Sequence, residues 1–353
     1  APILVALGNP GNMGICVACH TRDIAGALGL HRAAVVQYIR PEIIGLVLGA
    51  VIAAIASREF LPRGGSAPVT RFVLGAMVMV AALVFLGCPL RMILRIAGGD
   101  LNAVIGLIGF AAGIGSGVFF LNRGYSLKRT YQLPRLEGAW MPAIHIGLLV
   151  LLLAAPAFIF FSQSGPGSMR APIWLALIAG LIVGVLAQRS RLCMVGGIRD
   201  VILFKDWTLL IGFLCILVAA LVANAAFGFF HLGFTGQPIA HNDGLWNFLA
   251  MAAVGLGSVM LGGCPLRQLI LSGEGNADSA VTVFGYFVGA AIAHNFKLAS
   301  SATVINDGIV SGGPTVAGKI ATAAIFVALV IIAAINSKKA AVSSSPAAES
   351  VAK

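Results

Sequence analysis

A five-residue motif, Gly-Cys-Pro-Leu-Arg, occurs twice in this chain, at residues 87–91 and 263–267, each time within apolar sequence. A second pair of segments lies at nearly the same offset: Cys16 with Arg22-Asp23, and Cys193 with Arg199-Asp200. The chain therefore contains two copies of one unit. Each copy places two thiols, a proline and several charges among hydrocarbon side chains, where polar groups are costly and usually mark the path of a substrate.

The composition indicates that both copies fold in lipid. Hydrophobic residues make up 59% of the 353 residues and charged residues only 10%, whereas soluble proteins carry about 25% charged residues. The net charge of +11 is typical of basic loops between membrane spans. No basic patch is interleaved with aromatic residues, so the sequence predicts a lipid bilayer and no nucleic acid as partner. Six cysteines are too few for a disulfide framework in so long a chain.

Nine apolar windows are long enough to cross a bilayer, which takes roughly 20 residues. They lie at 42–57, 70–86, 101–121, 142–162, 172–188, 207–229, 246–262, 279–299 and 317–335. Glycines recur along two of these windows in a pattern that suits close helix packing in lipid. These glycines are Gly106, Gly109, Gly113, Gly117, Gly285 and Gly289.

The segments after Cys16, Cys88, Cys193 and Cys264 are apolar but too short to span a membrane. We expect re-entrant half-helices there, which are tolerated at membrane depth only where protein or a water-filled cavity satisfies their backbone. The predicted fold class is an all-α polytopic membrane protein. It is an inverted repeat of helices with re-entrant, Cys-bearing half-helices and an hourglass-like form.

The duplication sets the expected domain boundaries. They are a first repeat at 1–140, a linking helix and loop at 141–171, a second repeat plus terminal helix at 172–338, and a disordered tail at 339–353. A full span precedes Cys193, but only fifteen loop-like residues precede Cys16, so we expect the first repeat to lack its first helix. With that helix restored, an odd number of crossings precedes the second copy. Inverted-repeat transporters have this plan, with a site near the midplane.

Lysine and arginine are unevenly distributed over the loops. Successive loops lie on alternate sides of the membrane. The side that includes the loop at 123–135 holds the larger share of lysine and arginine and is therefore expected to be cytoplasmic. The sequence predicts a multi-pass protein of a bacterial inner membrane whose C-terminal tail is cytoplasmic. Cys16 and Cys88 are then expected to enter from the outer face, and Cys193 and Cys264 from the cytoplasmic face.

The repeated motif has a specific physical interpretation. Proline is favoured at the first position of a helix, so Pro89 and Pro265 are expected to start half-helices with Cys88 and Cys264 at or near the N-cap. The positive end of the helix dipole and the unpaired N–H groups would attract an anion there. Arg91 and Arg267 lie in the first turns of these half-helices, where their guanidinium groups could donate hydrogen bonds to an oxyanion. Alternatively, each motif is a packing turn whose Cys is a small buried apolar residue.

The remaining cysteines and charges have less specific settings. Cys16 and Cys193 are predicted to line the same path. The pairs Arg22-Asp23 and Arg199-Asp200 are expected to form salt bridges that hold their loops rather than contact substrate. Asp100 and Asp278 are expected to be N-caps of helices. Cys215 has no counterpart in the other copy and is expected to lie in the core.

One segment supports a different hypothesis. Residues 16–20 read Cys-Val-Ala-Cys-His, which matches the C-x-x-C-H attachment signature of c-type haem. A redox-active Cys16/Cys19 pair or a metal ligand set are further alternatives. The copy at Cys193 keeps neither the second Cys nor the His, and the other histidines show no zinc spacing. The transport interpretation is therefore favoured, with no cofactor and no metal expected.

At this point the motifs resemble those of a known family. They are the duplicated Gly-Cys-Pro-Leu-Arg, residues 9–16, Arg191-Leu192-Cys193, residues 196–200 and Ala293-His294-Asn295. The chain resembles the YeeE/YedE family of sulfur-transport membrane proteins and is most similar to its YedE branch, assigned as selenium transporters. Relatives take up thiosulfate through an hourglass-shaped protein in which cysteine thiols hand the anion along. By resemblance, Cys16, Cys88 and Cys264 match the path cysteines, and Cys193 is the fourth symmetry-related position.

The residues and the resemblance together predict passage of a small soft anion. The chain has no Walker motif and no readable Ser-His-Asp arrangement, so it is not expected to be an enzyme. We predict a transporter or channel that imports a small selenium- or sulfur-containing inorganic anion along pore-lining thiols. The alternatives are thiosulfate uptake specifically, and a membrane redox or sulfur-transfer enzyme that uses the cysteines as carriers. A cytoplasmic sulfur- or selenium-carrier protein is a further candidate partner.

Overall fold

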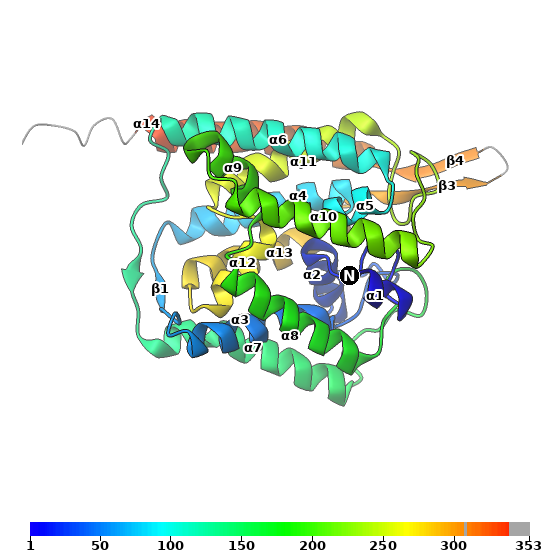
Figure 1. Cartoon of the computed structure of the whole chain (residues 1–353), viewed down its shortest axis with the longest axis horizontal. Helices are drawn as coiled ribbons and strands as arrows, with labels where there is room; N and C mark the ends of the chain where they lie inside the picture. Colours follow the sequence, from blue (N-terminus) through cyan, green and yellow to red (C-terminus); the bar gives the residue numbers. More distant parts are fainter. Residues whose placement is uncertain (307–308, 339–353) are drawn as a thin grey trace, which may run out of the picture.

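Helices form almost all of the fold in the computed structural model, which describes residues 1–306 and 309–338. Fourteen α-helices and four β-strands occur in these residues (Figure 1). Seven helical segments are apolar and long enough to cross a membrane. They confirm the prediction of a polytopic, all-α membrane protein. The expected C-terminal tail at 339–353 lies outside the described residues.

The two halves of the chain repeat the same order of elements. The first half contains α1 (Pro2–Ala6), α2 (Val17–Ala27), α3 (Pro41–Ala56), α4 (Pro68–Phe85), α5 (Pro89–Ala97) and α6 (Leu101–Asn122), followed by α7 (Arg135–Ala154). The second contains α8 (Ile173–Arg189), α9 (Met194–Phe204), α10 (Thr208–Ala226), α11 (Gly244–Met260), α12 (Pro265–Gly273) and α13 (Ala277–Asn295), followed by α14 (Val316–Lys338). The duplicated sequence therefore produces a duplicated local structure.

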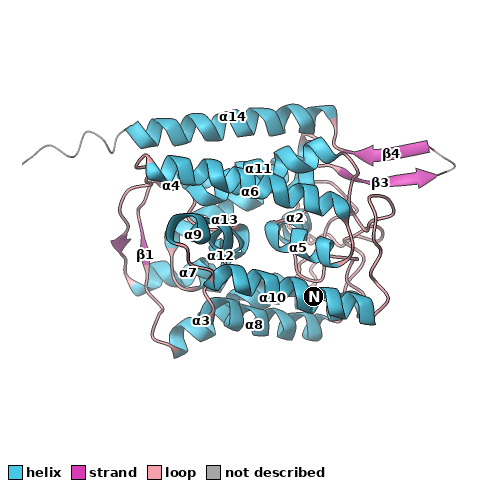
Figure 2. Ribbon diagram, turned by 45° about the horizontal axis from the view of Figure 1, so that its top comes forward, coloured by secondary structure: helices cyan, strands magenta, loops and turns pink. Residues whose placement is uncertain are grey.

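Short strands lie at the ends of the bundle. β1 (Arg63–Gly64) pairs with β2 (Tyr131–Gln132), and β3 (Ser301–Asn306) pairs with β4 (Ile309–Gly313). Figure 2 shows the β3–β4 strands extending beyond the helices at one end. All strand pairs are antiparallel and peripheral, so the helices alone position the interior of the protein.

Each of the nine apolar windows overlaps a helix, but the boundaries differ in places. The helices at 42–57 and 279–299, which are α3 and α13, are not among the seven span-length segments. The window at 142–162 was the least accurate, because α7 begins at Arg135 and ends at Ala154. Pro156 explains the early end, since the residue before a proline is driven out of the helical region, and Ala155 has the left-handed φ of 42°. Helix α3 has 16 residues and is shorter than the seven span-length segments.

Long helices of one repeat pack along long helices of the other. α4 runs against α13 and α6 against α11, and glycines allow both approaches. Gly113 of α6 faces the carbonyl of Ala252 in α11, and Gly289 of α13 faces the carbonyl of Ala76 in α4. A Cβ at either glycine would overlap the facing carbonyl oxygen, which confirms the close packing expected from the glycine pattern.

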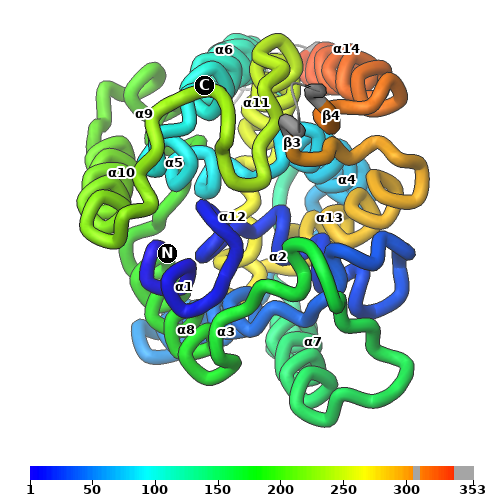
Figure 3. The backbone as a smooth tube through the Cα atoms, turned by 90° about the vertical axis from the view of Figure 1, so that its right-hand side faces the viewer, coloured from blue at the N-terminus to red at the C-terminus, as the bar shows by residue number. Residues whose placement is uncertain are grey.

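The short helices lie inside this frame. Every residue of α2 is buried, although α2 carries Arg22 and Asp23. Helices α5 and α12 are also largely buried. Figure 3 shows α2 and α12 in the middle of the molecule, with the long helices around them. The long helices thus enclose the ends of the short helices, whose unpaired backbone groups lipid could not satisfy.

We expect Gly113→Ala to destabilise the protein by about 1–3 kcal/mol, the usual cost of overpacking. The added methyl group would force α6 away from the Ala252 carbonyl. Gly115→Ala is the matched control in the same helix, because nothing lies within 4 Å of a Cβ there. Thermal unfolding in detergent measures both variants, and an equal shift of the two melting temperatures would contradict the packing argument.

Candidate functional site

The four duplicated cysteines all occupy the same kind of position, the N-cap of a short helix. Cys16 precedes α2, Cys88 precedes α5, Cys193 precedes α9 and Cys264 precedes α12. Prolines stand at the start of α5 and α12, as the sequence predicted for Pro89 and Pro265. The positive ends of four helix dipoles therefore point at four thiols.

The four thiols form two pairs. The Sγ atoms of Cys16 and Cys88 are 3.9 Å apart, and the thiols of Cys193 and Cys264 adjoin one another in the second repeat. We call these the first and second thiol pairs. All four residues are at most 5% exposed. Each pair joins the N-termini of two short helices of one repeat, an arrangement that concentrates N–H groups and positive dipole ends on one point.

Local contacts around the sulfurs are duplicated as well. The Sγ of Cys16 accepts a hydrogen bond from the backbone N–H of Cys19, and the Sγ of Cys193 accepts one from Gly196, both at 3.3 Å. Each sulfur thus caps its own helix. Cys16 and Cys193 are equivalent in structure, although their flanking sequences differ more than those of Cys88 and Cys264.

The two arginines of the repeated motif have different partners. Arg91 is fully buried and donates to the backbone carbonyls of Asn12, Leu86, Pro238 and Ile239. Arg267 instead pairs with Glu274 at 3.1 Å and is 12% exposed. Both guanidinium groups are therefore held by protein groups, and only Arg91 lies among the thiols.

Cys19 is a fifth thiol that the sequence analysis did not place in the path. Its sulfur accepts a hydrogen bond from Arg91 Nη1 at 3.7 Å and donates to the carbonyl of Leu86 at 3.8 Å. The three-residue spacing from Cys16, nearly one helical turn, was the signal available in the sequence. The second repeat has Gly196 at the corresponding position, so this thiol belongs to the first repeat alone.

The C-x-x-C-H segment does not fit a haem. Cys16, Cys19 and His20 have 0% exposure, and the Nε2 atom of His20 lies 3.2 Å from the Met13 carbonyl oxygen. A porphyrin bonded to both thiols would need the space that α2 and its neighbours fill. Among the described residues, no group of three or more His, Cys, Asp or Glu is placed to hold a metal ion.

The expected salt bridges are present in both repeats. Arg22 contacts Asp23 at 2.6 Å, and Arg199 contacts Asp200 at 2.7 Å. Asp23 also binds Arg40 at 2.7 Å, and all three side chains are buried. Asp23 is thus shared by two arginines, and Arg40 also donates to the carbonyls of Met169 and Pro166, so each of these buried charges has a partner.

Two predictions about individual residues were wrong. Asp278 is not an N-cap, because Asn276 caps α13 while Asp278 accepts hydrogen bonds from Ser66. Asp100 caps α6 as expected. Cys215 is exposed rather than in the core, because it lies on the outward face of α10, a helix with few buried residues.

A cavity of about 620 Å³ lies beside Leu86, the residue just before the first Gly-Cys-Pro-Leu-Arg motif. Its lining includes Arg22, Leu86, His294 and Lys297, and the Leu86 carbonyl contacts both Arg91 and Cys19. The cavity therefore borders the backbone that contacts Cys19. Its lining carries the positive charge of Lys297, which suits an anion, whereas the charge of Arg22 is paired with Asp23.

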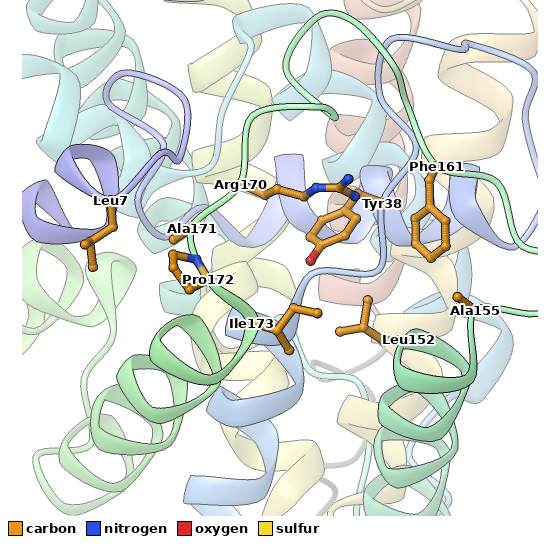
Figure 4. A pocket seen from close by; sticks show the side chains of 9 residues that line it. All are labelled: Leu7, Tyr38, Leu152, Ala155, Phe161, Arg170, Ala171, Pro172 and Ile173. Carbon is orange, nitrogen blue, oxygen red and sulfur yellow. The ribbon is translucent and has the colours of Figure 1, made fainter.

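A second cavity, of about 540 Å³, has a different character. Figure 4 shows Arg170 lying over the ring of Tyr38, with Phe161, Leu152 and Ile173 around them. The Arg170 guanidinium carbon is 4.9 Å from the Tyr38 ring centre. No cysteine lines either cavity, but of the two only the first is lined by Leu86, whose carbonyl oxygen contacts Cys19 and Arg91.

Comparison with known proteins relates this geometry to sulfur transport. Residues 189–352, which include the second thiol pair, match the model of the sulphur transport family. The thiosulfate transporter TsuA of Escherichia coli (strain K12) is 30% identical over 125 residues, 35% of this chain and 35% of that protein. The thiosulfate transporter TsuA of Spirochaeta thermophila is 29% identical over 121 residues, 33% of this chain and 35% of that protein. The chain thus matches about a third of the length of these curated relatives.

We expect the first thiol pair to form a disulfide readily when oxidised, because its sulfurs are already neighbours. The test uses a variant that retains only Cys16 and Cys88, treated with the thiol oxidant diamide. The loss of two hydrogens in the intact mass measures the bond. A variant that retains Cys88 and the exposed Cys215 is the control. Failure of the first variant to close would contradict the pairing.

Proposed function

We propose that this chain is a membrane transporter for a small sulfur- or selenium-containing anion, which passes from the first thiol pair to the second. The observation that carries the proposal is the pair of buried thiol clusters, each built from the N-termini of two short helices. Helix N-termini favour anions, and buried polar positions in a membrane protein usually serve a substrate. The sulfur-transport match over residues 189–352 supports the same class.

The chemistry of the lining favours a soft anion over a hard one. A thiol is a weak hydrogen-bond donor with a polarizable sulfur, which suits the terminal sulfur of thiosulfate or its selenium analogue better than the oxygens of sulfate. Hard oxyanions are usually bound by arginine forks. Here Arg91 and Arg267 are engaged with carbonyls and with Glu274, so the thiols are the groups at the helix ends that remain for the substrate.

We infer an inverted repeat with an hourglass-like path. In the order of elements, α4 corresponds to α11 and α6 to α13. Exchange of the two repeats therefore turns the contact between α4 and α13 into the contact between α11 and α6, and both contacts are present. The first thiol pair is then reached from the outer face through the cavity lined by Lys297, and the second from the cytoplasmic face. The protein lies in a bacterial inner membrane with a cytoplasmic C-terminus, and a cytoplasmic carrier protein is a candidate acceptor.

Thiosulfate is our first candidate substrate, because the two relatives that match are thiosulfate transporters. A selenium analogue is the second, from the resemblance to the YedE branch. The test measures uptake of labelled thiosulfate into proteoliposomes in the presence of selenosulfate, selenite or sulfate. The strength of competition by each anion ranks the candidate substrates. Strong competition by sulfate would contradict the argument for a soft anion.

The Cys16/Cys19 spacing and the contact of Arg91 with Cys19 favour one alternative, a membrane enzyme that transfers sulfur or electrons. Such an enzyme would leave a chemically altered product or a persulfide on a cysteine. Transport predicts thiosulfate that accumulates unchanged. Chemical analysis of the liposome lumen and intact mass analysis of the protein distinguish the two functions.

We expect Cys88→Ser and Cys264→Ser each to lower thiosulfate uptake at least about tenfold, equivalent to about 1.4 kcal/mol on the limiting barrier. Serine keeps a donor at the helix N-terminus but removes the polarizable sulfur. Thermal stability should change little, because the volume changes little.

Cys215→Ser is the matched control, because Cys215 lies on the exposed face of α10. Its uptake should equal that of the wild type. Normal uptake in both Cys88→Ser and Cys264→Ser would show that the paired thiols are structural and would refute the handover along sulfur.

A further inference from the structure

Tyr286 lies on the helix that connects the two thiol pairs in space. Helix α13, which carries it, packs against α2 of the first repeat and α12 of the second. Figure 1 shows these three helices together in the middle of the molecule. Because Cys16 begins α2 and Cys264 begins α12, α13 packs against one helix from each thiol pair.

The surroundings of Tyr286 contain both thiol pairs. Its electrostatic neighbours are the thiols of Cys88, Cys193 and Cys264, one from the first pair and both from the second. The side chain is 1% exposed. The buried phenol is thus carried by a helix that packs against α2 and α12, one thiol-bearing helix from each pair.

The hydroxyl of Tyr286 has no hydrogen-bond partner among the residues that the structure describes. A buried hydroxyl that stays unpaired is costly, and such a group in a native protein calls for an explanation. Tyr38 also has an unpartnered hydroxyl, but Tyr38 lines a cavity of about 540 Å³. Tyr286 lines none of the cavities described above.

The corresponding position in the first repeat is Phe110, at the same offset of 176 residues that relates Cys88 to Cys264. Phe110 is also fully buried. The ring is thus common to both repeats, and packing accounts for it. The hydroxyl is present in one repeat only, so packing does not account for it.

We propose that the Tyr286 hydroxyl donates a hydrogen bond to an oxygen of the thio-oxyanion as the anion passes between the two thiol pairs. This assignment rests on the proposed function and makes Tyr286 a specificity-determining residue. The thiols contact the soft terminal sulfur or selenium, while the hydroxyl is a harder donor that suits an oxygen atom. Together they select an anion that has both kinds of end.

The test compares Tyr286→Phe with the wild type in two measurements, thiosulfate uptake by proteoliposomes and thermal stabilisation of the purified protein by thiosulfate. We expect the variant to raise the KM for thiosulfate about tenfold, equivalent to about 1.4 kcal/mol, and to lose most of the thiosulfate-induced stabilisation. Without thiosulfate, its melting temperature should equal or exceed that of the wild type, because no protein hydrogen bond is removed.

Tyr38→Phe is the matched control, since it removes the other unpartnered tyrosine hydroxyl among the described residues, which lines the cavity of about 540 Å³, and its KM should be unchanged. Wild-type KM and stabilisation in Tyr286→Phe would overturn the assignment, as would a fall in melting temperature without thiosulfate, which would indicate a structural hydrogen bond. If the wild type neither binds nor transports thiosulfate or selenosulfate, the proposed function fails first and the assignment fails with it.

Discussion

The fold depends on hydrogen bonds to the backbone groups of helices that end in the interior. Lipid offers no hydrogen bonds to a broken helix, so protein groups must supply them. At the end of α4, Arg95 donates to the carbonyl of Phe85 at 2.9 Å, and Arg91 donates to the carbonyl of Leu86. His241 Nε2 lies 2.9 Å from the Val84 carbonyl oxygen. Three buried side chains thus cap the last turn of α4, and the break that follows becomes possible.

The second repeat solves the same problem with a different set of donors. At the end of α11, Gln268 donates to the carbonyl of Leu261 at 3.0 Å, and Tyr125 donates to that of Met260 at 3.4 Å. Gln268 replaces a methionine, Met92, of the first repeat. Both breaks also have an arginine donor, because Arg71 donates to the Leu261 carbonyl at 3.4 Å. At the first break the charge of Arg95 is paired with Asp100 at 2.7 Å, so Arg91, which donates to backbone carbonyls, distinguishes the first break from the second.

The sequence was sufficient for features that depend on local chemistry. Pro89 and Pro265 fix helix starts by their geometry, and the glycines at 113 and 289 report a close helix approach because a side chain would not fit. The pairing of Cys16 with Cys88 depends on how α2 and α5 meet, and nothing in either segment encodes that distance. Cys215 was misassigned because the outward face of α10 is as apolar as its inward face. Asp278 was misassigned for a local reason, since Asn276, two residues before it, is the N-cap of α13.

Duplication in sequence does not imply duplication of function, and the departures from symmetry are informative. Cys19, Arg91 and Arg95 occur on the first side, where the second repeat has Gly196, a differently paired Arg267 and Leu271. The hydroxyl of Tyr286 occurs in the second repeat only. In the transporter that we propose, the anion would therefore meet similar sulfur contacts at the two thiol pairs but different neighbouring groups beside them.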